Sequence, residues 1–365
     1  MKTIQNHSKA KKAGQVLYPS LLALLMLFCS LSSWADSQER VKTKEFSKSF
    51  DASKSDNVYI DNRFGNITVT YWNKNEVSIR IVVEAKARNE ERAQASIDRV
   101  RISMDKTGNM ISAVTSLKEQ NSGNNSNESF SIKYFVNMPN GITCDLNQKY
   151  GNINMPEDNK GKCMLHVKYG NINGGNFTGQ LEVEAQYGNI EIGSVGHAEL
   201  DLAYCGSSSL VNAGNLTVDS RYSTLNMQKV NKLDMEMRYG GFDIENLETA
   251  SLDIKYSQGN IRYLKEGLDV ELGYSTVNIR EVSSNFKNID AESHYGNLNI
   301  NIPSNASFSV SAEGMKNGKY DISGFNVTNS HVEDKTDYTT EVNGGRGGRI
   351  EYEGNSYGSL KIRTR

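Results

Sequence analysis

Acidic side chains recur at a nearly constant spacing along the middle of this 365-residue chain. One row places an Asp or Glu in seven successive units of a sequence repeat, and a second, less complete row runs two positions ahead of it. The first row is Glu184, Asp201, Asp219, Glu236, Asp253, Glu271 and Glu292, and the second is Glu182, Glu199, Asp234, Asp269 and Asp290. Clustered carboxylates can hold Ca²⁺ or serve as the acid and base that cleave a glycosidic bond. The third interpretation is a solvated face whose charges pair with neighbouring cations.

A row of cations follows the first acidic row two positions later. It consists of Lys149, Lys168, Arg221, Arg238 and Lys255. If the repeats stack, the result is an acidic stripe with a basic edge, in which like charges about 5 Å apart repel by on the order of 1 kcal/mol in water and nearby cations offset that repulsion. The stripe is uniform, whereas an active site is a local exception to a repeat. The pattern therefore favours a solvated or binding face over a catalytic groove.

Other chemistry is sparse. The five histidines are His7, His166, His197, His294 and His331, and none pairs with another at the spacing of metal ligands. No Ser or Cys lies in a nucleophile motif. The stretch "NGGRGGR" lacks the Lys-Ser/Thr of a phosphate-binding loop and opens no helix, which indicates a plain loop. A net charge of -2 gives no basic surface for nucleic acid. We therefore predict a protein that is not an enzyme, with no catalytic, cofactor-binding or metal-binding residues.

Two of the cysteines occupy equivalent repeat positions. Cys144 and Cys163 are separated by the same stretch of sequence as Tyr150 and Tyr169. Their Cα atoms should lie about 5 Å apart, within disulfide range, and an oxidising compartment would permit the bond. Directly stacked parallel strands suit the disulfide dihedral angle poorly, so two buried free thiols are the favoured outcome. Cys205 is left over at a corner as a free thiol.

The elements that position these rows form a tandem repeat centred on "YGNI". Its tyrosine recurs in nine copies at a nearly constant step, at Tyr150, Tyr169, Tyr187, Tyr204, Tyr222, Tyr239, Tyr256, Tyr274 and Tyr295. A sustained period of about 18 residues is typical of a solenoid. Adjacent strands lie about 4.8 Å apart, so nine stacked coils would span roughly 40 Å.

Each copy shows the alternation of a strand. In the copy of Tyr239, Leu233 and Met235 lie six and four positions before the tyrosine and share its parity. After the tyrosine the parity changes, and Phe242 and Ile244 lie three and five positions on. A third apolar residue follows eight positions after the tyrosine in several copies. We therefore expect two strands and a short third side in each coil.

The parity change predicts a corner at the Gly or Ser that follows each tyrosine. The tyrosines then form a stacked ladder with their rings inward, and a ligand platform is the alternative interpretation. The asparagines of "GN" are expected to stack and to hydrogen-bond between coils. We interpret two copies, "AYCGSSSL" and "KYSQGNI", as carrying additional residues, and we expect a bulge at each of these corners.

The N-terminus has the features of a secretory signal. Four lysines precede the apolar run "LLALLMLFCSL", and Ser33 and Ala35 suit a cleavage ahead of Asp36. The apolar run is short for a membrane span, and no later stretch is apolar enough to cross a bilayer. We predict an exported bacterial protein of the periplasm, the outer cell surface or the medium, with no membrane span after cleavage.

The sequence predicts an all-β fold, a right-handed parallel β-solenoid of about nine 17–19-residue coils with an N-terminal β-rich cap that contains one short helix. The expected segments are 1–35 for the signal peptide, 36–57 for a linker, 58–143 for the cap, 144–301 for the solenoid and 302–365 for a C-terminal β-strand cap. The helix is "NEERAQASIDRVRI", with Asn89 as its N-cap. A first, imperfect copy of the repeat lies at Phe64.

These motifs, in this order, resemble the putative adhesin domain family of exported bacterial β-strand-repeat proteins, a domain of unknown function. The resemblance rests on "FGNITV", "EERAQASIDRV", "VNMPNG", the "YGNI" corners and "IPSNASFSVSAEG", and covers about residues 55 to 365. It implies a cell-envelope role in adhesion and supplies no catalytic residues. We expect a glycan, extracellular matrix or envelope-protein partner, with Ca²⁺ as a weaker expectation. The alternatives are a carbohydrate-active β-helix enzyme and an envelope scaffold without a ligand.

Overall fold

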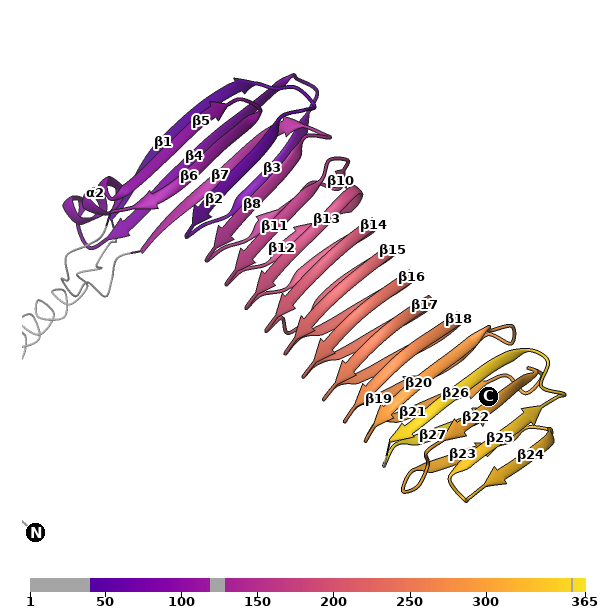
Figure 1. Ribbon diagram of the computed structural model, residues 1–365. Helices are drawn as coiled ribbons and strands as arrows, with labels where there is room; N and C mark the ends of the chain where they lie inside the picture. Colours follow the sequence, from indigo (N-terminus) through magenta and orange to yellow (C-terminus); the bar gives the residue numbers. More distant parts are fainter. Residues whose placement is uncertain (1–39, 119–128, 356) are drawn as a thin grey trace, which may run out of the picture.

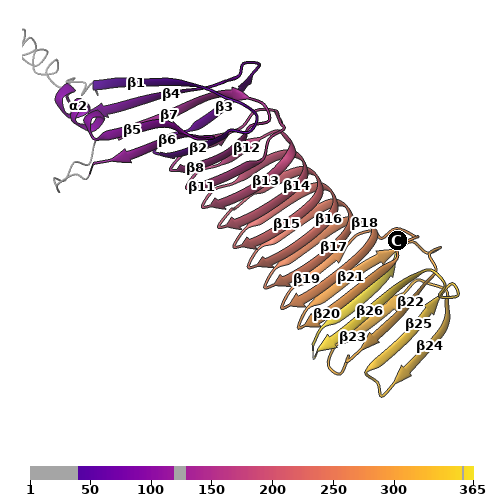
Figure 2. The same cartoon turned by 45° about the horizontal axis from the view of Figure 1, so that its top comes forward.

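The structure of the protein is a computed structural model that describes residues 40–118, 129–355 and 357–365. The described residues form an all-β chain whose strands join in one mixed sheet, with a single helix, α2 (Glu90–Asp98). Figures 1 and 2 show an elongated stack of coils with a group of longer strands at its N-terminal end and a second group at its C-terminal end. The predicted signal peptide lies outside the described residues.

The coils of the stack pair in parallel, and between β8 and β21 each coil pairs with the coil one repeat later along the chain. The first and last coils join the stack after longer stretches of chain. Their strands are β2 (Asn57–Arg63), β3 (Ile67–Trp72), β8 (Thr143–Lys149), β9 (Ile153–Asn154), β10 (Asp158–Asn159), β11 (Cys163–Lys168), β12 (Ile172–Gly174), β13 (Asn176–Gln186), β14 (Ile190–Ala203), β15 (Ser208–Arg221), β16 (Thr224–Arg238), β17 (Gly241–Lys255), β18 (Gln258–Gly273), β19 (Thr276–Ile279), β20 (Asn288–His294), β21 (Asn297–Ile302), β26 (Gly348–Asn355) and β27 (Ser359–Thr364). Equivalent repeat positions are direct partners, as Val218, Met235 and Leu252 are.

The core of the stack consists of the apolar columns that the repeat predicts. Side chains six and four positions before each tyrosine are buried in all nine copies, as are the apolar residues three and five positions after it. The predicted third side is also buried, at Val195, Val230, Leu247, Leu264 and Val282. One coil alone would leave these side chains in water, so the stacking of neighbours supplies the burial that stabilises each coil.

The tyrosines correct one prediction, because their rings lie outside the core. All nine have a positive φ, between 51° and 60°, and are 43% to 56% exposed. The left-handed conformation reverses the direction of the side chain, so the tyrosine leaves the face on which its strand parity would place it. The corner is therefore the tyrosine itself rather than the residue that follows it.

The residue after the tyrosine is small because it touches the neighbouring coil. A Cβ on Gly170 would lie 1.9 Å from the carbonyl oxygen of Gly151. Where Ser stands instead, its hydroxyl donates to the carbonyl two positions earlier, as Ser275 does to Gly273 at 2.8 Å, and accepts from the preceding coil, as from Ser257 N at 3.0 Å. Glycine and serine are thus two ways of packing coil against coil at the same corner.

Of the two bulges expected at corners, only one is present. The corner of Tyr204 contains one residue more than its neighbour, since Ser208 rather than the third residue after the tyrosine pairs with Leu225. The corner of Tyr256 has no insertion, because Gly259 pairs directly with Phe242. The expected bulge there is wrong. Glycine replaces an inward apolar residue, and the ring of Phe242 fills the space that its side chain would occupy.

The asparagines of the "GN" motif hydrogen-bond between coils, as predicted. The side-chain oxygen of each accepts from the backbone N–H of the equivalent residue one coil later, at 2.9 Å in four successive coils. These acceptors are Asn66, Asn152, Asn171 and Asn189. Each bond satisfies a corner N–H that the strand ladder leaves free.

The N-terminal group of strands covers the first coil. It contains β1 (Arg40–Asp51), β4 (Glu76–Ala87), β5 (Val100–Thr107), β6 (Met110–Leu117) and β7 (Ser129–Pro139). β4 pairs antiparallel with β1 and β7, and β6 pairs antiparallel with β5 and in parallel with β2. The predicted helix is present, and the side chain of Asn89 caps it by accepting from Arg92 N at 2.9 Å.

The C-terminal group covers the last coil. It contains β22 (Phe308–Glu313), β23 (Lys319–Ser323), β24 (Val327–Glu333) and β25 (Asp337–Val342). β26 and β27 return to the stack after this excursion and pair in parallel with β20 and β21. "NGGRGGR" lies at the turn between β25 and β26, as the plain-loop interpretation predicts.

The three cysteines in the described part of the chain are free and buried. Cys144 and Cys163 are direct partners in β8 and β11, which confirms their shared column. The neighbouring Cys163 thiol and burial raise the pKa of Cys144. Cys205 follows Tyr204 at the corner, where its thiol points to the carbonyl oxygens of Ala185 and Ala203 and so replaces the serine of other coils.

Candidate functional site

The two acidic rows lie together on one outer face of the stack, which we call the acidic face. Parallel register makes each carboxylate the direct partner of the next, as in the run from Asp201 through Asp219, Glu236 and Asp253 to Glu271. The same column continues to Glu292 and then to Glu353 of β26. The strands that hold these side chains are fixed by the buried columns on their other side. A flat and nearly continuous row of carboxylates results.

The basic row compensates part of this charge, as the sequence predicts. Arg221 Nη2 lies 2.9 Å from Asp219 Oδ2, and Arg238 Nη2 lies 3.8 Å from Glu236 Oε2. Lys255 Nζ bridges two coils, 3.0 Å from Asp253 Oδ2 and 3.4 Å from Glu271 Oε1. These pairs are largely solvent-exposed, and such pairs contribute about 0–1 kcal/mol each.

The compensation is incomplete at Asp201. Its pKa is raised, first by partial burial and then by the negative charge of Asp219, against the opposing effect of Arg221. Ala203 and Gln186 stand where other coils carry a cation. The N-terminal part of the acidic face therefore carries uncompensated negative charge that a cationic partner could neutralise.

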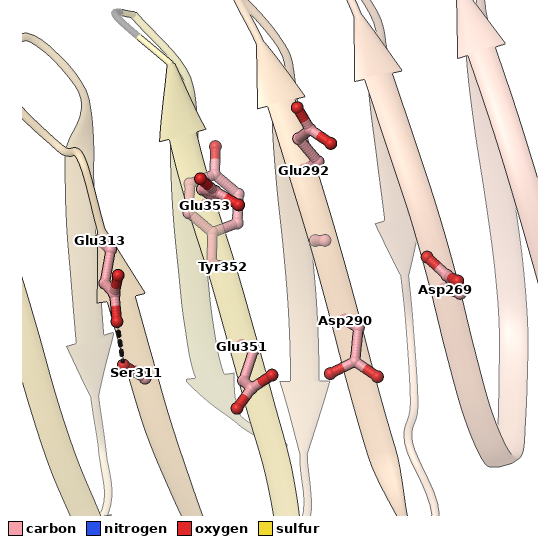
Figure 3. Close-up of a pocket in the computed structure, with 9 residues that line it drawn as sticks. Asp269, Asp290, Glu292, Ser311, Glu313, Glu351, Tyr352 and Glu353 are labelled. Carbon is pink, nitrogen blue, oxygen red and sulfur yellow. Dashed lines mark hydrogen bonds between the residues drawn. The ribbon is translucent and has the colours of Figure 1, made fainter.

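The C-terminal end of the acidic face is the most acidic part of it. A shallow hollow there is lined by Asp269, Asp290, Glu292, Glu313, Glu351 and Glu353, among others. Figure 3 shows these carboxylates on the outer side of neighbouring strands, with one hydrogen bond among the residues drawn, from Ser311 to Glu313 at 3.4 Å. Arg349 is the cation beside them, 2.7 Å from Glu351 and 3.7 Å from Asp290.

The described residues contain no group of three or more His, Cys, Asp or Glu side chains arranged to hold a metal ion. His166 lies between two carboxylates, 3.7 Å from Asp145 and 3.4 Å from Glu184. Within the described part of the chain, we also find no helix with the length and apolar character needed to cross a membrane.

A second surface is the aromatic ladder, the stack of rings along one edge of the coils. It consists of Phe64, the nine repeat tyrosines and Tyr357. Neighbouring tyrosines within the nine copies are 4.8 to 5.2 Å apart, centroid to centroid, and within 11° of parallel. The ring faces cover one another, so the ladder presents ring edges and hydroxyls to solvent. The tyrosines are therefore accessible to a ligand, as the alternative interpretation of the ladder as a ligand platform requires.

Sequence reasoning missed Tyr357, whose ring stacks on Tyr295 at 5.3 Å. Tyr357 lies several repeat lengths beyond Tyr295 in the sequence, so the period of the repeat does not reach it. The signal was available in "YGSLKI", which matches "YGNLNI" of the preceding coil in position and polarity.

Among the comparisons with known proteins, only the comparison of structures finds matches. No family profile matches the chain, and no curated protein is similar enough to count as a match. The structure is similar to that of a putative cell adhesion protein from Clostridium sporogenes, with 10% identity over 89% of this chain and 100% of that chain and a TM-score of 0.20. It is also similar to a putative adhesin from Parabacteroides merdae, with 9% identity over 70% of this chain and 96% of that chain and a TM-score of 0.31.

A putative adhesin from Parabacteroides distasonis is similar at 11% identity over 71% of this chain and 93% of that chain, with a TM-score of 0.29.

Proposed function

We propose that the protein is an exported, adhesin-like binding module, built as a right-handed parallel β-solenoid, that holds a glycan, matrix or protein partner on its acidic face. The proposal is carried by one observation, the nearly continuous row of exposed carboxylates from Glu184 to Glu353 on a flat sheet. Carboxylates in such a row repel one another, which costs free energy. A face that contacted only solvent would gain nothing from keeping this row. A partner with spaced cationic or hydroxyl groups would relieve that repulsion over many coils.

The geometry favours binding over catalysis. Glycan cleavage requires two carboxylates at a defined separation around one bond, in a site that excludes water. The hollow at the C-terminal end of the acidic face is open to solvent, and its carboxylates continue the same repeated rows. The uniform repeat supports many weak, equivalent contacts, which together give a strong attachment.

The experiment is a binding screen of the chain from residue 36 onward on glycan and extracellular-matrix arrays, with and without Ca²⁺. The test variant neutralises three neighbouring carboxylates, Glu236→Gln, Asp253→Asn and Glu271→Gln. Their ion pairs are exposed or partly exposed, so their loss should change the fold little. Binding that the test variant loses supports the proposal, and a requirement for Ca²⁺ would show that cations bridge the face to its partner.

A matched control neutralises three other exposed carboxylates in the same region of the stack. Asp243→Asn, Glu245→Gln and Glu248→Gln lie after the tyrosine corner rather than on the acidic face. They also have partners in the next coil, such as Arg262 for Glu245 and Lys265 for Glu248. The control removes the same charge and should bind like wild type. Equal loss in both variants would contradict the assignment of the acidic face.

A further inference from the structure

The N-terminal third of the aromatic ladder differs from the rest in the charged side chains that lie beside it. Here the basic row consists of Arg63, Lys149 and Lys168, which are direct partners in successive coils. Among the described residues, none of these three cations forms an ion pair with a carboxylate. Further along, Arg221, by contrast, is held by a carboxylate of its own coil.

The sequence explains this difference. For the two lysines, the position two before the cation is Asn147 in one coil and His166 in the next, whereas it is acidic in every later coil of the repeat. Arg63 does have Asp61 two positions before it, but these two side chains, both in the described part of the chain, form no ion pair. Without a carboxylate beside them, two of the lysines turn toward the ladder. Lys149 Nζ lies 5.2 Å from the ring centroid of Tyr150, and Lys168 Nζ lies 5.7 Å and 5.9 Å from the ring centroids of Tyr169 and Tyr187.

The ladder beside these cations offers unsatisfied polar groups. No hydrogen bond joins the hydroxyls of Tyr150, Tyr169 or Tyr187 to another group in the described part of the chain, and each ring is nearly half exposed. A shallow hollow adjoins these rungs, lined by Arg63, Lys149 and Lys168 together with His166, Asp61 and Glu184, among others. Glu184 faces His166, which lies 3.4 Å away.

We propose that this segment, from Phe64 to Tyr187, binds an acidic polysaccharide. Carboxylates or sulfates of the chain would pair with Arg63, Lys149 and Lys168, while its hydroxyls would hydrogen-bond to the tyrosine hydroxyls. The proposal goes beyond the proposed function by naming a ligand class and a second surface. It is confined to these rungs, because beyond Tyr187 the adjoining acidic face repels an anionic chain.

The spacing of the rungs favours a polysaccharide over an acidic peptide. The rings from Phe64 to Tyr187 follow one another at 4.9 to 5.1 Å. An extended peptide presents side chains on one face at every second position, about 6.6 to 6.8 Å apart, so it cannot match the rungs one to one. A sugar unit instead carries several hydroxyls around its ring, so a polysaccharide can contact neighbouring tyrosines without matching their spacing one to one.

The test measures binding of three probes by isothermal titration calorimetry at low and high salt. The probes are polygalacturonate, the same polymer with its carboxylates methyl-esterified, and poly-L-glutamate. We expect polygalacturonate to bind, the neutral ester to bind at least about tenfold more weakly, and salt to weaken binding because the contacts are exposed charges.

Two variants locate the site. Lys149→Gln with Lys168→Gln should weaken polygalacturonate binding by about tenfold, the combined effect of two exposed ionic contacts. Lys229→Gln with Lys232→Gln removes the same charge from exposed lysines away from the ladder and should change nothing. Tyr169→Phe with Tyr187→Phe keeps the ring stack while removing two hydroxyls, and it should weaken binding without lowering thermal stability.

Equal binding of the esterified polymer, preferential binding of poly-L-glutamate, or unchanged affinity in the Lys149 and Lys168 variant would each overturn the proposal. Failure of wild type to bind polygalacturonate would also overturn it. The proposal for the acidic face would still stand if the Glu236, Asp253 and Glu271 variant loses a ligand found on the arrays. Loss of polygalacturonate binding in that acidic-face variant alone would place the ligand on the acidic face.

Discussion

The corners of the coils give a sharp test of the stacked architecture, through the substitution Gly170→Ala. A methyl group on Gly170 would lie 1.9 Å from the oxygen and 2.6 Å from the carbon of the Gly151 carbonyl, both in the neighbouring backbone. Cβ atoms in proteins essentially never come within 3.0 Å of such atoms. The two coils must therefore separate by at least about 1 Å at this corner, since backbone cannot rotate out of the way as a side chain can.

The expected loss in the free energy of unfolding follows from the hydrogen bonds at that corner. Gly151 N donates to Tyr169 O at 3.2 Å, and Ile153 N donates to Asn171 O at 2.9 Å. Losing two such bonds costs about 1 kcal/mol each, and overpacking adds about 1–3 kcal/mol. Alanine returns about 0.4–1 kcal/mol by restricting the unfolded chain. We expect Gly170→Ala to lower the free energy of unfolding by about 2–5 kcal/mol.

Gly206→Ala is the matched control, because Gly206 belongs to the widened corner of Tyr204 and a Cβ there has nothing within 4 Å. It should leave stability within about 1 kcal/mol of wild type, since only the unfolded-state effect remains. The assay is urea unfolding followed by far-UV circular dichroism, with the slope m compared among the three proteins. Equal stability of the two alanine variants would refute the close approach of coil on coil at the glycine corners.

Three further predictions concern titratable groups and thiols. Asp201→Asn should stabilise the protein at neutral pH. The raised pKa of Asp201 means that its ionisation lowers the stability of wild type as pH rises through that pKa. The gain of the variant over wild type should therefore vanish below pH 3.8, where the carboxyl is protonated in both the folded and the unfolded state. Asp56→Asn should destabilise it by about 1–3 kcal/mol, since backbone hydrogen bonding and Lys106 Nζ at 3.1 Å lower the pKa of Asp56. That contribution is present above pH 3.8 and is lost as pH falls through the lowered pKa, so urea titrations across this range test both signs. Cys144 and Cys163 should react with iodoacetamide only after unfolding, and a mass two hydrogens lower without reductant would show a disulfide instead.

The buried columns could be predicted from the sequence because they depend only on period and polarity. A column of Leu, Val and Met at one repeat position can be satisfied only by stacking, as Leu233 and Met235 illustrate. The acidic face followed for the same reason, since residues of opposite parity to a buried column must point outward.

The direction of the tyrosines could not be derived from parity, because parity assumes extended backbone. A left-handed residue such as Tyr239, with φ of 55°, reverses its side chain. Non-glycine residues avoid this region at a cost of roughly 1–2 kcal/mol, so a tyrosine there is not the default expectation. Ring stacking, at about 0.5–1.5 kcal/mol per pair, offsets that cost only when the coils are already in register.

The last coil could not be predicted from the period of the repeat, because the chain leaves the stack before forming it. β26 and β27 complete the stack only after β22 to β25 have covered its end, which places Tyr357 far from Tyr295 in the sequence. The unpaired state of Lys149 and Lys168 was likewise not predicted, because it depends on the absence of a carboxylate two positions earlier in only a few coils.

The central claim is that the acidic face holds a partner, and the array measurement on matched variants tests it most directly. The account predicts a ligand that wild type and the Asp243, Glu245 and Glu248 control bind alike and that the Glu236, Asp253 and Glu271 variant loses. A ligand retained in full by that acidic-face variant, with or without Ca²⁺, would contradict the claim.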